Sequence, residues 1–155
     1  MLATILAVAG TLLGAVVTGA IQYLSAGRTA RAARQQTLWD TRLDAVTTLA
    51  AAVSEHRRAM WNRGEAVAKR EPDTRIQELK AQSRVTRSAI DRPLNVLRVL
   101  VTDPAVRSAA DAMVSATYAM RQAHTSLDTL TQARETAVRA YDTFIDTAAA
   151  YLAAH

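Results

Sequence analysis

The pattern of apolar and polar positions divides the chain into an uncharged first stretch and a longer amphipathic remainder. Residues 1–24 contain no charged side chain and consist mainly of Ala, Leu, Val, Ile, Gly and Thr. A helix of roughly 20 apolar residues is long enough to cross the hydrocarbon core of a bilayer. The sequence therefore predicts one N-terminal transmembrane helix, with residues 1–26 as the anchor.

Basic residues follow the apolar stretch at once and set the expected topology. Arg28, Arg31 and Arg34 lie in a juxtamembrane segment, residues 27–36, and no basic residue precedes the apolar stretch. Because Lys and Arg are enriched on the cytoplasmic side of membrane spans, we expect a single-pass protein of the cell membrane with its N-terminus outside. The three arginines would then lie among lipid headgroups. A cleaved signal peptide is the alternative, but the basic n-region is missing and the apolar stretch is longer than signal peptides require.

Small residues recur at helical spacing inside the predicted anchor. They fall three or four positions apart on one helical face, and two of them, Gly10 and Gly14, form a GxxxG pair that lets two backbones approach closely in lipid. This pattern predicts self-association of the anchor, although Gly and Ala are also common in membrane helices generally. The face consists of Ala3, Ala7, Gly10, Gly14 and Thr18.

Residues 37–155 place apolar side chains at three- and four-residue spacing, which is typical of amphipathic helices. Four such segments with short connections predict an all-α, antiparallel cytoplasmic bundle of about four helices, the first continuous with the anchor. The expected core positions are Trp39, Leu43, Val46, Ala50, Val53 and Met60, then Ile76, Leu79, Ser83, Ile90, Leu94, Leu97 and Val101, then Val106, Ala109, Met113, Ala116, Met120 and Ala123, and finally Leu127, Leu130, Val138, Tyr141, Ile145, Ala148 and Leu152.

The predicted helix ends rest on local signals. Gly64 and residues 69–72 mark the end of the first amphipathic helix, and Thr74 with Gln77 predicts a capping box for the second. Pro93 is expected to kink or split that second helix, since proline removes a backbone donor and clashes with the preceding turn.

The later boundaries are expected at two further places. Asp103 followed by Pro104 predicts the start of the third helix, with the acid as N-cap and proline in the first turn. A short turn at residues 124–126 would then lead into the last helix.

Charge is spread unevenly along the chain. The net charge is +5, but residues 28–98 carry fifteen Lys/Arg against eight Asp/Glu, a net of +7, and residues 99–155 carry four against six. The half next to the predicted anchor is therefore the basic half. Such a half suits anionic headgroups, and it also suits nucleic acid.

Residues that commonly carry catalysis are few in this chain. It has no cysteine and no Gly-rich phosphate-binding loop, and His56, His124 and His155 lack metal-ligand spacing. Asp142 and Asp146 share a helical face but have no Glu-x-x-His partner for a di-metal site. We therefore expect no enzyme, catalytic residue, metal or cofactor, and interpret these histidines and acids as solvated helix surface.

Seven basic residues of the central region have two open interpretations. They are either a solvated face opposite acids of neighbouring helices or candidate phosphate contacts of a nucleic-acid surface, which would bind with a steep salt dependence. No DNA-reading motif accompanies them. The seven are Arg57, Arg58, Arg63, Lys69, Arg70, Arg84 and Arg87.

Three segments of the chain resemble a known family. They are AVAGTLLG at residues 7–14, HRRAMW at 56–61, and RVTRSAI at 84–90, which leads into Pro93 and Leu94. Together they resemble the short membrane-anchored KilB-type spread proteins of Streptomyces and related actinobacteria, over most of the chain and in order. The resemblance implies a role in conjugative plasmid transfer or spread at the cell membrane, and it brings no catalytic residues with it.

The leading functional hypothesis is a non-enzymatic, single-pass membrane scaffold or assembly protein. Its expected partners are membrane lipid, further copies of itself and a membrane protein such as a DNA translocase. One alternative is a membrane-tethered basic module that binds nucleic acid, which a salt titration would reveal. A third is a small phage- or plasmid-borne membrane effector, whose toxicity would depend on an intact anchor.

Overall fold

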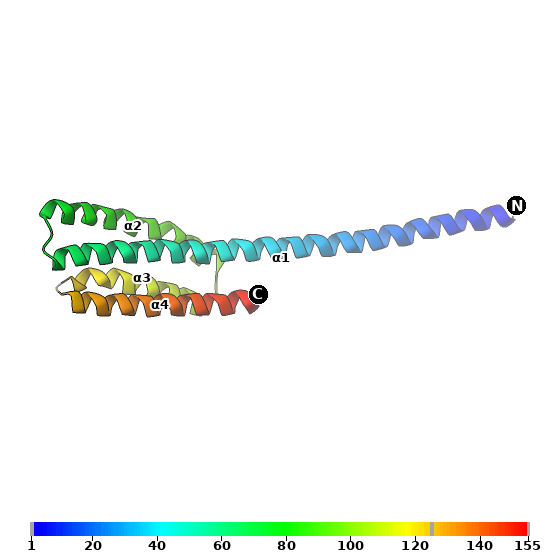
Figure 1. Cartoon of the computed structure of the whole chain (residues 1–155). Coiled ribbons are helices and arrows are strands. Elements are labelled where there is room, and N and C mark those ends of the chain that lie inside the picture. The colour runs from blue at the N-terminus through cyan, green and yellow to red at the C-terminus, as the bar shows by residue number, and fades with distance from the viewer. Residues whose placement is uncertain (1, 125, 155) are drawn as a thin grey trace. The chain divides into compact units, whose positions relative to one another are not determined.

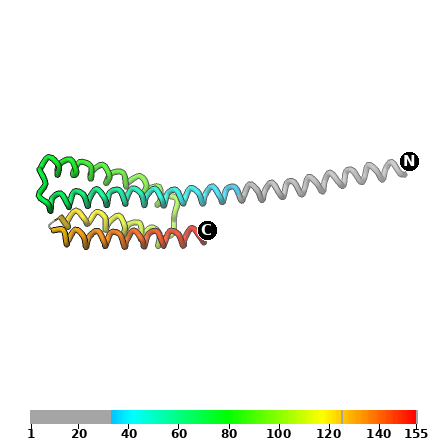
Figure 2. The backbone as a smooth tube through the Cα atoms, viewed as in Figure 1, coloured from blue at the N-terminus to red at the C-terminus, as the bar shows by residue number. Residues whose placement is uncertain are grey.

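The chain is predominantly α-helical in the part that the computed structural model describes. Side chains are described for residues 33–124 and 126–154 (Figure 2). By contacts along the backbone the chain divides into two units, Met1–Trp39 and Asp40–His155. The all-α prediction is confirmed. The helices are α1 (Leu2–Ala68), α2 (Asp73–Leu100), α3 (Pro104–Ala119), one turn of 3-10 helix η1 (Met120–Ala123), and α4 (Leu127–Ala154).

The unit Asp40–His155 is an antiparallel bundle of four helices. Its part of α1 lies beside α2, α3 and α4, and each connection reverses the direction of the chain (Figure 1). The connections are short, which makes consecutive helices neighbours in space. The prediction of a four-helix antiparallel bundle is thus confirmed for this unit.

The core of the bundle contains large apolar side chains from every helix. Leu49 of α1, Ile90 and Leu97 of α2, Met113 of α3 and Phe144 of α4 are all completely buried. Complete burial of such a side chain contributes roughly 1.5–3 kcal/mol. A second, smaller core group lies toward the end of the bundle where α1 meets the start of α4, and consists of Met60, Met120, Leu130 and Ala137.

Two predicted core positions are wrong, and several buried core residues were not predicted, among them Leu49 of α1 and two residues of α4. Trp39 keeps 37 % of its surface exposed because it belongs to the other unit, and Leu127 keeps 43 % because it stands at the first residue of α4. Ala137 and Phe144 are fully buried instead. The buried face of α4 is rotated slightly from the predicted one.

The start of α3 is built as its sequence predicts. The Asp103 carboxylate accepts hydrogen bonds from the backbone N–H groups of Ala105 and Val106, both at 2.9 Å, and Pro104 opens the helix. These two donors would otherwise have no partner within the helix. The Asp-Pro signal is confirmed.

The start of α2 differs from the predicted capping box. The helix begins at Asp73, and Pro72 stands at the N-cap position without any side-chain hydrogen bond. Thr74 is therefore already helical and cannot serve as the cap, so the predicted cap position is wrong by two residues. The Pro72 carbonyl instead accepts from the backbone N–H groups of Arg75 and Ile76, at 2.9 and 3.2 Å.

Pro93 and Gly64 both lie inside helices rather than ending them. α2 runs through Pro93 without being split. α1 likewise continues past Gly64 to Ala68. A Cβ at Gly64 would lie 2.7 Å from Leu130 Cδ2 and 2.8 Å from His124 Cδ2. A side chain at this position would therefore displace Leu130 and His124, which pack against the backbone of α1.

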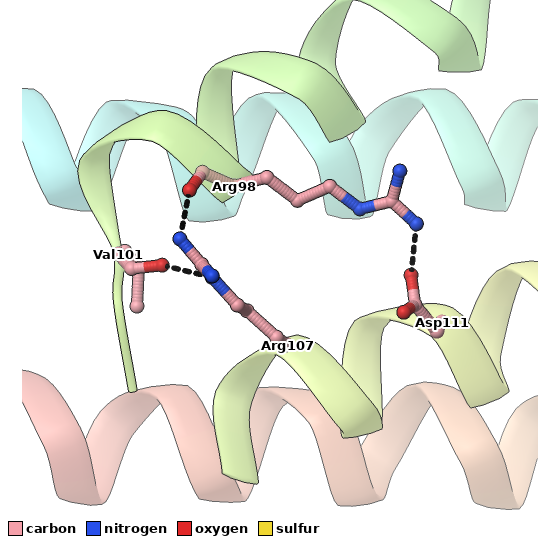
Figure 3. A network of polar contacts seen from close by, with 4 residues as sticks. All are labelled: Arg98, Val101, Arg107 and Asp111. Atoms are coloured by element: carbon pink, nitrogen blue, oxygen red, sulfur yellow. Dashed lines mark hydrogen bonds and ion pairs between the residues drawn. The ribbon is translucent and has the colours of Figure 1, made fainter. Parts of the chain in front are cut away.

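Two arginine side chains link the end of α2 to the start of α3 (Figure 3). Arg107 donates from Nε to the Val101 carbonyl at 2.7 Å and from Nη2 to the Arg98 carbonyl. The guanidinium of Arg98 in turn forms an ion pair with Asp111 at 2.8 Å. The last carbonyl groups of a helix lack partners within it, so Arg107 satisfies two acceptors where α2 ends.

Candidate functional site

A basic pocket lies among α1, α2 and the end of α3. Its residues on α2 follow helical spacing and so share one face, and α1 and η1 contribute further cations. The hollow has a volume of about 180 Å³. We call it the basic pocket. It is lined by His56, Met60 and Arg63 of α1, Lys80, Ser83, Arg84 and Arg87 of α2, Tyr118 of α3 and Arg121 of η1.

His56 is a buried member of this pocket. Only 2 % of the residue is exposed, and its Nδ1 lies 2.9 Å from the hydroxyl oxygen of Thr86. The ring of Tyr118 meets it edge-on, with the centroids 5.5 Å apart. Burial, and then the charge of Arg87, lower the pKa of His56 to about 4. The prediction that His56 belongs to the solvated surface is wrong, because its face of α1 is turned toward α2.

The five cations of the basic pocket have no acidic partners among the described residues. The ion pairs formed within that part of the chain are Lys69–Glu65, Arg75–Glu78 and Arg98–Asp111, all outside the pocket. Arg87 stacks its guanidinium 4.5 Å from the ring centroid of Tyr118. The pocket therefore holds an uncompensated positive charge.

Arg63 and His124 are affected most directly by this charge. Burial lowers the pKa of Arg63, and the charges of Arg121 and Arg84 lower it further. The buried Nε of Arg63 and the buried Nε2 of His124 find no hydrogen-bond partner among the described residues. Burial, followed by the charge of Arg63, also lowers the pKa of His124. This histidine is half-buried, so its assignment to the solvated surface is wrong as well.

Arg57 and Arg58 line a different hollow, against α4. Arg57 lies 5.0 Å from the ring centroid of Tyr141 and donates to the Ser54 hydroxyl at 3.3 Å. Arg134 of α4 stacks on Trp61 of α1 at 4.8 Å. Burial is the main cause that lowers the pKa of Arg57. Arg57 and Arg134 therefore join α1 to α4, and neither they nor Arg58 line the basic pocket.

Lys69 and Arg70 belong to the turn that ends α1. Lys69 forms an ion pair with Glu65 at 2.8 Å. Arg70 has a positive φ of 54°, its N–H donates to the Val67 carbonyl, and the next N–H, from Glu71, donates to the Ala66 carbonyl. This pair of bonds is the Schellman arrangement, which favours glycine at the left-handed position.

Replacing Arg70 with Gly is therefore expected to raise the stability of the bundle. Removing the Cβ relieves the left-handed strain, which is worth about 1 kcal/mol, and the added freedom of the unfolded chain offsets part of this gain. Urea unfolding of the full-length chain measures the change. Arg75→Gly is the matched control, because Arg75 lies within α2, where glycine costs about 1 kcal/mol. A loss of stability in Arg70→Gly would contradict this account of the turn.

The seven predicted phosphate contacts thus fall into three places. Arg63, Arg84 and Arg87 come together in the basic pocket, whereas Arg57 and Arg58 face α4 and Lys69 and Arg70 lie in a turn. The sequence reasoning missed two cations of the pocket. Lys80 precedes Arg84 by four residues, so helical periodicity would have found it. Arg121 comes from a separate element, and no local signal marks it.

The predicted anchor lies outside the described side chains. This applies to its small-residue face, Ala3, Ala7, Gly10, Gly14 and Thr18, and to Arg28 and Arg31. Arg34 is described and is exposed. Within the described residues, no helix combines the length and apolarity of a membrane span. The same residues contain no group of three or more His, Asp or Glu side chains that could hold a metal ion.

Comparison with known proteins assigns a family. Residues 43–152 match the family described as KilB plasmid transfer protein. Protein KilB of Streptomyces lividans is 37 % identical over 149 residues, which cover 96 % of this chain and 97 % of that protein. No solved structure matches the chain. Both the family match and the near-complete alignment confirm the resemblance seen in the sequence, and the chain belongs to the KilB family of plasmid transfer proteins.

Proposed function

We propose that this chain is a non-enzymatic scaffold of plasmid transfer, held in the cell membrane by residues 1–26. One observation carries the proposal. The match to the plasmid transfer family, residues 43–152, falls within the bundle unit, and the uncharged stretch of residues 1–24 lies ahead of it. An apolar anchor and a packed helical bundle are thus separate parts of one chain, and the bundle is the part that defines the family.

The segment between the proposed anchor and the bundle unit is short. Residues 25–39 separate the uncharged stretch from the bundle unit. Even fully extended, these residues span no more than about 50 Å. The alignment with Protein KilB of Streptomyces lividans covers 96 % of the chain and therefore includes most of the anchor stretch. A bundle held this near the bilayer is suited to organising other proteins at the membrane surface.

The charge of the chain supports a cytoplasmic bundle. Arg28, Arg31 and Arg34 follow the anchor directly, and residues 28–98 carry a net charge of +7. Basic residues next to a span favour the cytoplasmic side and are attracted to the anionic lipids of that leaflet. The proposed topology therefore has the N-terminus outside and lipid as the first partner.

An apolar strip on α2 supports contact with a second copy of the chain. Val99 is 79 % exposed and Val96, one turn earlier, is 41 % exposed. With Leu100 they line a shallow hollow of about 600 Å³ that also includes the side chain of Arg92. Exposed apolar surface of this kind commonly marks a protein interface. We assign this α2 strip, together with the small-residue face of the anchor, to self-association, and a DNA translocase is the further partner that we propose.

The mass of the full-length protein tests the proposal. The tagged chain is extracted from its native membrane in mild detergent, and whatever co-purifies is identified. We expect a discrete homo-oligomer or a complex with a translocase. Val99→Glu should lower the mass, and Val85→Glu should not, since Val85 is also a highly exposed valine of α2 but lies outside the strip. Recovery of the protein without detergent, or as a monomer with nothing bound, would contradict the proposal.

A further inference from the structure

We propose that the basic pocket binds a compact phosphate-bearing anion, of the class formed by pyrophosphate and the triphosphate chain of a nucleotide. A scaffold needs no such ligand, so the inference goes beyond the proposed function and does not depend on it. It rests on the charge of the pocket, on an unused donor in its wall and on its shape.

The positive charge of the basic pocket favours the binding of an anion. Arg63, Lys80, Arg84, Arg87 and Arg121 come from three elements and converge on one hollow of about 180 Å³. None of them forms an ion pair with a carboxylate in the described part of the chain. Like charges held this close repel one another, and a bound anion removes that repulsion while it gains charge-assisted hydrogen bonds.

One donor in the pocket wall is unused. The Nε–H of Arg63 is buried and finds no acceptor among the described residues. Buried donors are usually paired, so an unpaired one in a native structure needs an explanation. Arg63 lines the basic pocket. A bound phosphate would bring acceptor oxygens and negative charge next to the Arg63 side chain.

The shape of the pocket favours a small anion over a duplex. Its lining combines three buried residues, His56, Met60 and Ser83, with three exposed arginines, Arg84, Arg87 and Arg121. At about 180 Å³ it is smaller than the roughly 300–1,000 Å³ of sites that enclose a whole organic ligand. A phosphate chain fits such a recess. The backbone of a duplex is a convex surface, which exposed side chains contact more readily than a recess does.

Aromatic surface adjoins the phosphate recess. Arg87 stacks on Tyr118 with 4.5 Å between the guanidinium and the ring centroid, so its planar donors are held at the pocket edge. A pre-positioned guanidinium can donate two parallel N–H bonds to two phosphate oxygens, a planar geometry that the lysine ammonium does not have. Arg87 is therefore the side chain that we expect to select a phosphate over a single halide ion.

Isothermal titration of the full-length chain in a non-ionic detergent tests the inference. The probes are pyrophosphate, ATP, inorganic phosphate and glycerol 3-phosphate, which stands for a lipid headgroup. We expect pyrophosphate and ATP to bind more tightly than the two monophosphates. The double variant Arg84→Gln/Arg121→Gln should raise their dissociation constants at least about tenfold, since each lost charge-assisted bond is worth that much.

A matched double variant supplies the control. Arg58→Gln/Arg139→Gln removes the same charge from exposed positions outside the pocket and should leave both dissociation constants unchanged. The pocket variant should also unfold at a temperature no lower than the parent without ligand, because it removes repulsion. Failure of pyrophosphate and ATP to bind, or equal weakening in both double variants, would overturn the proposal.

Titration with oligonucleotides tests whether the ligand of the basic pocket is the phosphate backbone of a nucleic acid instead. A duplex and a single-stranded oligonucleotide, both without terminal phosphates, are titrated across a salt series. We expect weak binding that responds equally to the two double variants. If an oligonucleotide binds tightly and only the pocket variant loses it, while ATP does not bind, the pocket is a nucleic-acid contact and the small-anion proposal is wrong.

Discussion

Replacing Phe144 with Ala is expected to lower the free energy of unfolding by about 3–5 kcal/mol, the range for deleting a buried aromatic ring. Phe144 is completely buried in the larger core group of the bundle, among residues of all four helices. The surrounding side chains can collapse only partly into the space, so the variant loses both the transfer free energy of the ring and its packing contacts. Denaturant unfolding of the full-length chain, followed by far-ultraviolet circular dichroism, measures the loss.

The control for this prediction is Leu127→Ala in the same helix. Leu127 is 43 % exposed at the first residue of α4, so its removal should change stability by no more than about 0.5 kcal/mol. If the two variants lose the same amount, Phe144 does not occupy the core and the arrangement of α4 is different from the one described.

Acidification from pH 7 to pH 5 is expected to cost the bundle about 2 kcal/mol through His56. Its pKa is about 4 in the folded protein and 6.5 ordinarily. Between these two values the unfolded chain binds the proton and the folded chain does not, so stability falls as the pH falls. Ordinary carboxylates and arginines keep their charge over this range. Urea unfolding at a series of pH values measures the slope of the free energy of unfolding against pH.

Substitution of the histidines isolates this effect. His56→Gln keeps a polar side chain that can bond to Thr86 and should remove most of the slope. His124 has a pKa lowered in the same direction, so His56→Gln/His124→Gln should leave the curve nearly flat between pH 5 and pH 7. A slope in the double variant equal to that of the parent would contradict the buried, uncharged state of His56.

Much of the fold could be predicted because it depends on local pattern. The three- and four-residue spacing of apolar side chains gives the helices, and Asp103-Pro104 marks the start of α3 as observed. Errors arose where neighbours in space decide the outcome. Gly64 looks like a helix end in the sequence, but it is the place where Leu130 packs against α1. Phe144 was left out because its neighbours Tyr141 and Ile145 are equally apolar, and only packing selects between adjacent faces.

The candidate site was predictable only in part. Helical spacing connects Arg84 with Arg87, and both were candidate phosphate contacts. No spacing rule connects them with Arg63 or Arg121, because the three elements meet only through the tertiary fold. The burial of His56 depends on the same fold, since adjacent residues of α1 face α2 and α4 in turn. A charge pattern in the sequence therefore could not separate the basic pocket from the arginines that join α1 to α4.

A plasmid-transfer assay tests the central claim, that a membrane-held bundle of this chain serves plasmid transfer. Donor cells that lack the protein receive the full chain, residues 27–155 alone, or residues 27–155 fused to an unrelated single-pass span, at matched protein levels. We predict that the full chain restores transfer and that residues 27–155 alone do not. The chain with the unrelated span should restore the part of transfer that needs only attachment to the membrane. It should not restore the part that needs the small-residue face. Full transfer with residues 27–155 located in the cytosol would contradict the account.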